Sequence, residues 1–282
     1  MTRSLGKIVL TGAAGALGNE LRPLLAGMAR ELVSTDLQEA PAELHDNETW
    51  AVADVGEMDQ IGPLIDGAEM VVHFAARVDE EPFETLWKPN FVGAYNVWEA
   101  AHKAGARRVV YASSIHAVGM SETNAGIDTD TPHRPDTFYG LAKCFAEDLG
   151  RMYWEKRGLE SVHLRILSCQ KEPGNVRALG TWLSYRDMCQ LVQRSIETPV
   201  VGFTVVYGVS ANTRAPVSNH KVPFLGYRPQ DNAEDFAEAL FAKQPDPVDP
   251  QDPFHSRVGG PFAAVELGES GVALIRKMSG LD

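Results

Sequence analysis

A tyrosine and a lysine four residues apart, Tyr139 and Lys143, are the residues of this 282-residue chain best suited to proton transfer. In a helix this spacing puts both side chains on one face. A phenol with its reference pKa of about 10 is a poor base at neutral pH, and a nearby ammonium favours the phenolate. Ser114, after the apolar run 108–113, has a hydroxyl that can hydrogen-bond a substrate oxygen as charge changes there. We therefore expect Ser114, Tyr139 and Lys143 to form a catalytic trio.

A glycine-rich turn, Gly12-Ala13-Ala14-Gly15-Ala16-Leu17-Gly18, follows the first apolar run. Glycine allows a positive φ and the close approach of backbone to a pyrophosphate, whose negative charge the amides at a helix N-terminus attract. A tight strand-to-helix turn without a ligand is the alternative. Because a strand pattern precedes the turn and a helical pattern follows it, we expect a dinucleotide site. Its contacts should come from Gly12, Ala14, Gly15, Ala16, Leu17 and Gly18.

Asp36 stands at the end of the second strand pattern, where a carboxylate can accept hydrogen bonds from both hydroxyls of an adenosine ribose. The same charge repels a 2′-phosphate, so Asp36 favours NAD over NADP. Asp54 can face the adenine amino group, and Val55 and Ala75, at the ends of the next two strand patterns, are expected to contact the cofactor as well. Either aspartate can instead be a solvated loop residue.

The elements that must position these residues are short β-branched runs alternating with helical patterns, which indicates βαβ units and a parallel sheet. We predict an α/β fold, a doubly wound (Rossmann) parallel sheet that binds ligands at the carboxyl ends of its strands. A surface Tyr–Lys pair and a Ser-Ser turn are each common, but together at that edge they favour an active site. The predicted strands are 7–11, 31–36, 50–53, 70–75, 108–113 and 161–166, and the predicted helices 15–28, 89–104, 139–156 and 186–197.

Residues 1–169 are predicted to form the NAD-binding domain, and residues 170–282 a smaller, more irregular substrate-binding lobe. A strand-like run, Phe203–Val209, falls in the second part. Four prolines between Pro245 and Pro253 predict an exposed extended loop. A helical pattern over Ser270–Met278 can be a mobile tail or an oligomer contact.

Composition narrows the classes of partner. The formal charge is −12, from 38 acidic and 26 basic residues, and such a surface repels nucleic acid and anionic membranes. The three cysteines have no Cys-x-x-Cys spacing, which favours a reducing compartment, and we expect a cytoplasmic protein without a signal peptide, a membrane span or a metal.

Taken together, the glycine turn, Ser114 and the Tyr-x-x-x-Lys of Tyr139 and Lys143 resemble the extended short-chain dehydrogenase/reductase family. A narrower resemblance, to uronate dehydrogenases, runs through the segments 111–116, 139–145, 165–169, 175–177, 180–182, 208–212, 224–227 and 258–260. Those enzymes oxidise the anomeric carbon of glucuronate or galacturonate with NAD and give an aldarolactone. The resemblance also implies a homo-oligomer paired through the helices 89–104 and 139–156.

The resemblance to uronate dehydrogenases also implies roles for substrate-binding residues. It implies that Arg177 binds the carboxylate of the sugar with help from Ser168, while His116 and Ser114 contact sugar hydroxyls. A guanidinium can hold a carboxylate by two parallel hydrogen bonds, although an isolated Arg177 could also be a solvated loop residue.

Two positions depart from the pattern of that family. Ile115 stands where an Asn is usual and Val78 where a Ser is usual, so hydrogen bonds to ring hydroxyls would be lost. Arg77 adds a positive charge beside Val78.

The expected activity is NAD-dependent oxidation of the anomeric hydroxyl of an acidic hexose to its lactone. Because of Val78 and Ile115, a C6-sulfonated hexose such as sulfoquinovose is an alternative substrate. A sugar-nucleotide epimerase or dehydratase is a further alternative on the same fold, and an NAD-sensing regulatory protein is another. Net NADH formation would separate a dehydrogenase from an epimerase.

Overall fold

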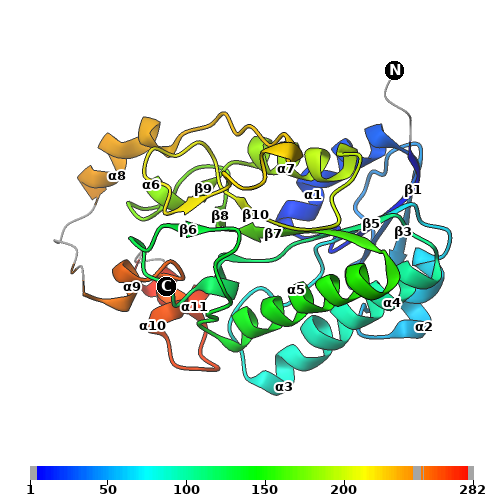
Figure 1. Ribbon diagram of the computed structural model, residues 1–282, viewed down its shortest axis with the longest axis horizontal. Helices are drawn as coiled ribbons and strands as arrows, with labels where there is room; N and C mark the ends of the chain where they lie inside the picture. Colours follow the sequence, from blue (N-terminus) through cyan, green and yellow to red (C-terminus); the bar gives the residue numbers. More distant parts are fainter. Residues whose placement is uncertain (1–4, 244–248, 250, 279–282) are drawn as a thin grey trace.

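The computed structural model describes residues 5–243, 249 and 251–278. Seven parallel strands form the central sheet in the order β10-β7-β5-β4-β1-β2-β3 (Figure 1). The order reverses between β1 and β4, which is the point where a doubly wound sheet opens a ligand crevice. The strands are β1 Leu5–Thr11, β2 Ala29–Asp36, β3 Glu48–Val52, β4 Met70–His73, β5 Arg108–Tyr111, β7 Glu160–Ile166 and β10 Phe203–Gly208. The predicted fold class is confirmed.

Helices cover both faces of the sheet. On one face α1 (Ala16–Met28) and α7 (Tyr185–Glu197) enclose a core that includes Leu21, Leu25 and Leu191. On the other, α2 (Met58–Ile65), α4 (Gly93–Lys103) and α5 (Phe138–Arg157) pack over Val71 and Val109. Strands buried on both faces require the continuous apolar runs that the sequence shows.

Two differences from the predicted elements concern helices. The helix expected from residue 89 begins with α3 (Phe83–Leu86) and a π-helical turn, Trp87–Val92, before α4. α2 was not predicted, because Gly62 and Pro63 lie inside it. Its Ile61 and Ile65 are fully buried, so tertiary packing outweighs the weak local propensity.

The strand-like run after residue 200 is β10, which pairs with β7 at the edge of the main sheet rather than lying in a separate lobe. The helix before it, α7, is the crossover that this parallel pairing requires. Residues assigned to the smaller lobe therefore complete the nucleotide-binding sheet.

Short elements make up the rest of the C-terminal part. They are β6 Ile127–Asp128 with β11 Val217–Ser218, β8 Ser168–Cys169 with β9 Trp182–Leu183, 3₁₀ turns at Ile115–Val118, Pro223–Leu225 and Ala233–Phe236, and helices α6 Ala178–Thr181, α8 Ala237–Lys243, α9 Pro253–Ser256, α10 Pro261–Ala264 and α11 Gly271–Met278. α11 agrees with the predicted C-terminal helix. Of the predicted proline loop, residues 245–248 and 250 lie outside the described residues, and Pro253 begins α9.

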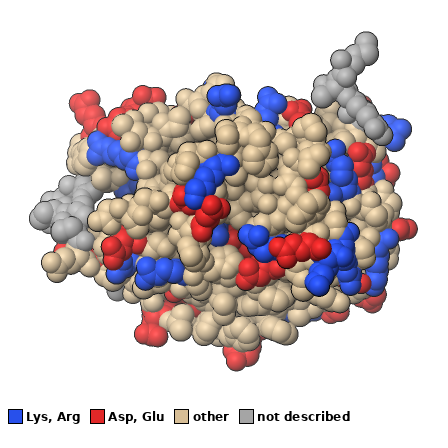
Figure 2. All heavy atoms as spheres, in the orientation of Figure 1, with Lys and Arg blue, Asp and Glu red and all other residues tan. Residues whose placement is uncertain are grey.

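Charged side chains of both signs are interspersed on the face shown in Figure 2. Several form exposed ion pairs, among them Arg214 with Glu234 and Lys221 with Asp130. Within the described residues no helix is long and apolar enough to cross a membrane.

Candidate active site

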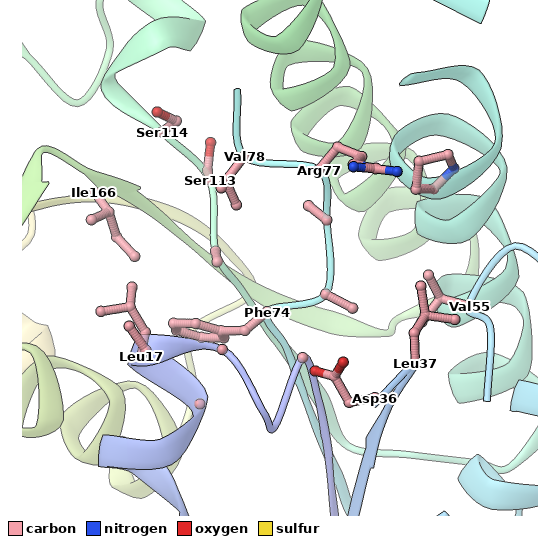
Figure 3. A pocket seen from close by; sticks show the side chains of 18 of the residues that line it. Leu17, Asp36, Leu37, Val55, Phe74, Arg77, Val78, Ser113, Ser114 and Ile166 are labelled. Atoms are coloured by element: carbon pink, nitrogen blue, oxygen red, sulfur yellow. The ribbon is translucent and has the colours of Figure 1, made fainter. Parts of the chain in front are cut away.

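One cavity, of about 540 Å³, lies at the carboxyl ends of the central strands (Figure 3). Its walls contain the glycine turn, the end of β2 and the predicted catalytic trio. The residues that line it are Gly12, Gly15, Ala16, Leu17, Gly18, Thr35, Asp36, Leu37, Gln38, Ala53, Asp54, Val55, Phe74, Ala75, Ala76, Arg77, Val78, Pro89, Ala112, Ser113, Ser114, His116, Tyr139, Lys143, Ile166, Leu167 and Cys169. In Figure 3, Asp36, Leu37 and Val55 are drawn at one end of this cavity, and Ser113, Ser114 and Val78 at the other.

The glycine turn can take a dinucleotide because its backbone is free of side chains and can approach the ligand closely. Its surroundings also leave no room for a side chain at two of the glycines. Gly12 has φ +76°, and a Cβ there would lie 2.6 Å from the backbone nitrogen of Ala75. A Cβ on Gly18 would lie 2.1 Å from the carbonyl oxygen of Gly12. α1 starts at Ala16, directly after the turn. The first N–H groups of a helix have no acceptor within the helix, so those of α1 are available to an anion in the cavity. This cradle suits the pyrophosphate of NAD.

The Asp36 carboxylate lies beside this turn. Its Oδ2 accepts a hydrogen bond from the amide of Ala14 at 3.0 Å, and its Oδ1 accepts one from the amide of Gln38 at 3.2 Å. The carboxylate is thereby oriented at the cavity wall.

Asp54, Val55 and Ala75 also line the cavity, as expected. The Asp54 carboxylate, however, already has partners: Oδ1 accepts from the amide of Gly56 at 2.8 Å, and Oδ2 lies 3.0 Å from Nζ of Lys88. The Ala75 amide donates to the Thr11 hydroxyl at 3.2 Å. An adenine contact at Asp54 would have to share the carboxylate with Lys88.

The trio meets at the opposite end of the cavity. Ser114, Tyr139 and Lys143 are 5%, 7% and 2% exposed, so each can act with little competition from water. The Lys143 ammonium donates to the carbonyl of Ala112 at 2.8 Å and lies 5.2 Å from the centre of the Tyr139 ring. The spacing and order of these residues therefore bring them together as predicted.

Burial is the largest influence on the pKa values of Tyr139 and Lys143. It raises the pKa of Tyr139 to about 12, although the hydrogen bond with the Ser114 hydroxyl lowers it in part. It also lowers the pKa of Lys143 to about 7, which the negative charge of Glu147 opposes. Desolvation of the phenolate is the largest cause of the Tyr139 shift, and the expected lowering of the tyrosine pKa by Lys143 is not among its causes. A positive charge brought into the cavity would lower the pKa of Tyr139.

His116 lines the cavity and is oriented by a buried carboxylate. Its Nδ1 lies 2.7 Å from Oδ2 of Asp136, and Oδ1 of Asp136 accepts from the Thr137 hydroxyl at 2.9 Å. The imidazole stacks on Phe262, with ring centres 4.1 Å apart. Because Nδ1 is engaged, Nε2 is the ring nitrogen available to a ligand.

Arg177 and Ser168 lie outside the lining of this cavity. The Arg177 guanidinium donates to the carbonyl of Val258 and packs on the backbone of Gly260. Its burial lowers its pKa to about 10, and the negative charge of Asp136 opposes that shift. The Ser168 hydroxyl lies 3.0 Å from that of Thr181.

The two positions that depart from the family pattern have different environments. Ile115 is 3% exposed and packs with Val118, Val209 and Val258, so its side chain belongs to the core and not to the cavity wall. Val78 is 67% exposed and lines the cavity, as does Arg77. Of the two residues, only Val78 is therefore placed where it can alter the substrate pocket.

Asp136 and Phe262 were not predicted from the sequence. Thr137 accepts from the amide of Gly140 as the N-cap of α5, and this capping pattern just before Tyr139 could have drawn attention to Asp136. No local pattern marks Phe262, which is remote from His116 in sequence. Among the described residues, no group of three or more His, Cys, Asp or Glu could hold a metal ion.

Comparison with known proteins agrees with this geometry. The NAD dependent epimerase/dehydratase family matches residues 8–169. The chain is 39% identical over 262 residues to the uronate dehydrogenase of Pseudomonas putida, covering 93% of this chain and 97% of that protein.

Two solved structures are similar over nearly the whole chain. The glucuronic acid dehydrogenase of Chromohalobacter salexigens has a TM-score of 0.89 at 37% identity, covering 93% of this chain and 98% of the other. A mutant uronate dehydrogenase of Agrobacterium tumefaciens complexed with NAD has a TM-score of 0.88 at 38% identity, with the same coverage. The chain is therefore an NAD-dependent dehydrogenase and belongs to the NAD dependent epimerase/dehydratase family.

Proposed function

We propose that the enzyme oxidises the anomeric C1 hydroxyl of an acidic hexose of the glucuronate or galacturonate type to its lactone. The observation that carries this proposal is that a single cavity contains both the glycine cradle and the Ser114–Tyr139–Lys143 trio. The names of the similar proteins supply the substrate class. NAD, when bound, accepts the hydride from C1.

Within this proposal Tyr139 accepts the proton of the C1 hydroxyl, and Ser114 donates a hydrogen bond to the same oxygen. The tyrosine pKa of about 12 must fall for this step, and Lys143 is the cation placed to lower it. A buried lysine with a pKa of about 7 can gain or lose a proton at working pH.

We further propose that Arg177 binds the acidic group of the sugar. A guanidinium has five N–H donors, so the bond to Val258 leaves others for a carboxylate. His116 would donate from Nε2 to a ring hydroxyl, and Ser168 would assist Arg177 from the neighbouring β8. Fixing the acidic end of the sugar places C1 over the trio.

Two observations at the cavity wall favour a second substrate, a C6-sulfonated hexose such as sulfoquinovose. Val78 offers no hydrogen bond to a hydroxyl there, and Arg77, whose guanidinium also lies 3.5 Å from Glu81, places a donor group at the same wall. A sulfonate keeps the need for Arg177. A sugar-nucleotide epimerase is less well supported, because the chain spans nearly the full length of enzymes named for free uronates.

We also propose that Asp36 makes the enzyme prefer NAD to NADP. The enzyme is further proposed to act in the cytoplasm as a homo-oligomer. Trp87, Tyr95, Leu141 and Phe145, on or next to α4 and α5, are exposed apolar side chains that support pairing through these helices. Light scattering after size-exclusion chromatography would test the pairing, and a monomer at micromolar concentration would contradict it.

The test of the activity is a panel of glucuronate, galacturonate, a C6-sulfonated hexose and neutral hexoses, each with NAD and with NADP. NADH formation is followed by absorbance, and the product is identified by mass spectrometry as the lactone. Acidic hexoses should give the highest kcat/KM. Faster turnover of neutral hexoses would reject Arg177 as the anchor, and conversion of sugar nucleotides without net NADH would favour an epimerase.

A further inference from the structure

Two consecutive carboxylates, Asp79 and Glu80, follow Val78 in the loop between β4 and α3. Arg77 and Val78 in this loop line the cavity, whereas Glu80 is 1% exposed and is used by none of the roles assigned above. A buried carboxylate needs hydrogen-bond donors around it. The donors of Glu80 come from two distant parts of the chain.

The first part is the start of α5. Oε1 of Glu80 accepts from the amide of Phe138 at 3.1 Å, and Oε2 accepts from the amide of Tyr139 at 2.9 Å. Thr137 accepts from the third amide, that of Gly140, at 3.0 Å. The first three N–H groups of α5 thus all have side-chain acceptors, and the negative charge of Glu80 lies at the positive end of the helix dipole. Tyr139 is the second residue of α5, so Glu80 fixes its backbone.

The second part is the tail, residues 268–278. Oε1 of Glu80 also accepts from the amide of Gly268 at 2.9 Å. Asp79 accepts from the hydroxyl of Ser270 and, at 3.1 Å, from the amide of Val272 at the start of α11. The two carboxylates therefore cap two helices at once, one carrying Tyr139 and one formed by the tail.

Apolar packing joins the same parts. Val272 and Ile275 of α11 pack on a cluster formed by Leu86, Tyr139 and Phe262. A Cβ on Gly271 would lie 2.4 Å from the Phe262 ring, so the tail lies directly against that ring. In Figure 1, α10 and α11 lie beside the end of α5 at which Tyr139 stands.

We propose that Glu80 is a positioning residue for Tyr139, and that Asp79 couples this position to docking of the tail. The proposal rests on the proposed role of Tyr139 as proton acceptor. Glu80 touches no reacting atom; it holds the two amides that set where the Tyr139 hydroxyl lies relative to Ser114. Asp79 holds the tail that covers the same helix start.

The test is Glu80→Gln, with Glu160→Gln as the control for a loss of stability away from the cavity. Glutamine keeps the shape but has only one acceptor oxygen, so one of the two α5 amides loses its partner. Glu160 is also buried, and its Oε1 accepts from two backbone amides, those of Val201 and Gly202, at 2.8 and 3.0 Å, while its Oε2 pairs with the buried Arg108. It stands at the start of β7, away from the cavity, so its substitution should cost at least as much stability without touching α5. Both variants should lower the melting temperature.

At a temperature where both variants are folded, Glu80→Gln should lower kcat about 10- to 100-fold, because small misplacements of a reacting group have effects of that size. The NAD Kd should change less than about twofold, and Glu160→Gln should keep the wild-type kcat. Amide hydrogen exchange at residues 138 and 139 should rise in Glu80→Gln only. Equal kcat in the two variants, or unchanged exchange at those amides, would overturn the role of Glu80.

Asp79→Ala, which removes both oxygens that accept from the tail, tests the coupling. It should speed amide exchange at Val272 and lower kcat by less than Glu80→Gln does. Wild-type kcat with a loosened tail would refute the coupling. Failure of the proposed function is recognised separately: Tyr139→Phe would then stay active, and the exchange at residues 138 and 139 would still decide whether Glu80 holds the start of α5.

Discussion

The two ends of the cavity are built in different ways. The cofactor end combines the backbone of one short stretch, Gly12 to Gly18, with the carboxylates of Asp36 and Asp54. The end that holds the trio is assembled from side chains on separate segments, so that His116 stacks on Phe262 and Glu80 caps the helix of Tyr139. The first end depends on the absence of side-chain volume, and the second depends on charge, orientation and burial.

This difference predicts which substitutions each end tolerates. At the cofactor end a single added methyl group should be severe because it meets backbone, which cannot rotate away. At the other end the loss of one hydrogen-bonding group should reduce turnover or substrate affinity while the fold persists.

The largest effect on cofactor binding should come from Gly18→Ala. Its Cβ would lie 2.1 Å from the carbonyl oxygen of Gly12, so the turn must shift, and NAD affinity should fall at least about 100-fold. Gly27→Ala is the matched control, because a Cβ there meets nothing within 4 Å. Calorimetric titration with NAD measures both; unchanged affinity in Gly18→Ala would contradict the backbone cradle.

At the other end, Arg177→Lys should raise the KM for the acidic sugar about 10- to 100-fold with a smaller change in kcat. Lysine keeps the charge but loses the planar pair of donors that binds a carboxylate. The control is Arg214→Lys, an exposed residue paired with Glu234. Steady-state kinetics at saturating NAD measure this KM. An unchanged KM would mean that another residue binds the acidic group of the sugar.

A smaller change is expected for Asp36→Asn, which removes the charge that repels a 2′-phosphate. The ratio of kcat/KM for NAD to that for NADP should fall roughly tenfold, as expected for one charge near a surface. Asp54→Asn serves as the comparison, because that carboxylate is paired with Lys88. A ratio that does not change would mean that Asp36 has no part in cofactor choice.

The smallest effect is on stability. The pKa of Lys143 is lowered to about 7 in the folded protein, against about 10.4 when unfolded, so the unfolded chain binds more protons between these values and stability rises with pH across that window. Below pH 7 the buried ammonium is a cost, and Lys143→Met should melt at least about 2 °C above wild type at pH 6. The difference in melting temperature between Lys143→Met and wild type should shrink by pH 9. Thermal unfolding at both pH values measures it, and Lys103→Met, at an exposed position, is the control.

Features set by neighbouring residues were predictable from the sequence. The glycine turn, the strand before it and the helix after it form one continuous segment, and Tyr139 and Lys143 share a helical face through their spacing alone. The six predicted strands all belong to the sheet, because apolar runs buried on both faces leave a strong pattern.

Features that depend on tertiary contacts were not predictable. The place of β10 depends on α7 packing beside α1, and the burial of Ile115 depends on Val209 and Val258 reaching it from far along the chain. The hydrogen bonds of Glu80 to the start of α5 span 58 and 59 positions. The raised pKa of Tyr139 likewise follows from burial, which spacing does not determine.

The most direct test of the account is Tyr139→Phe, which removes only the phenolic oxygen from the trio. With glucuronate and NAD, the variant should lose about 10²- to 10⁴-fold in kcat, the usual contribution of a positioned acid or base, while its NAD Kd stays within about threefold of wild type. Turnover close to wild type, with NAD bound normally, would contradict the claim that this hydroxyl accepts the proton.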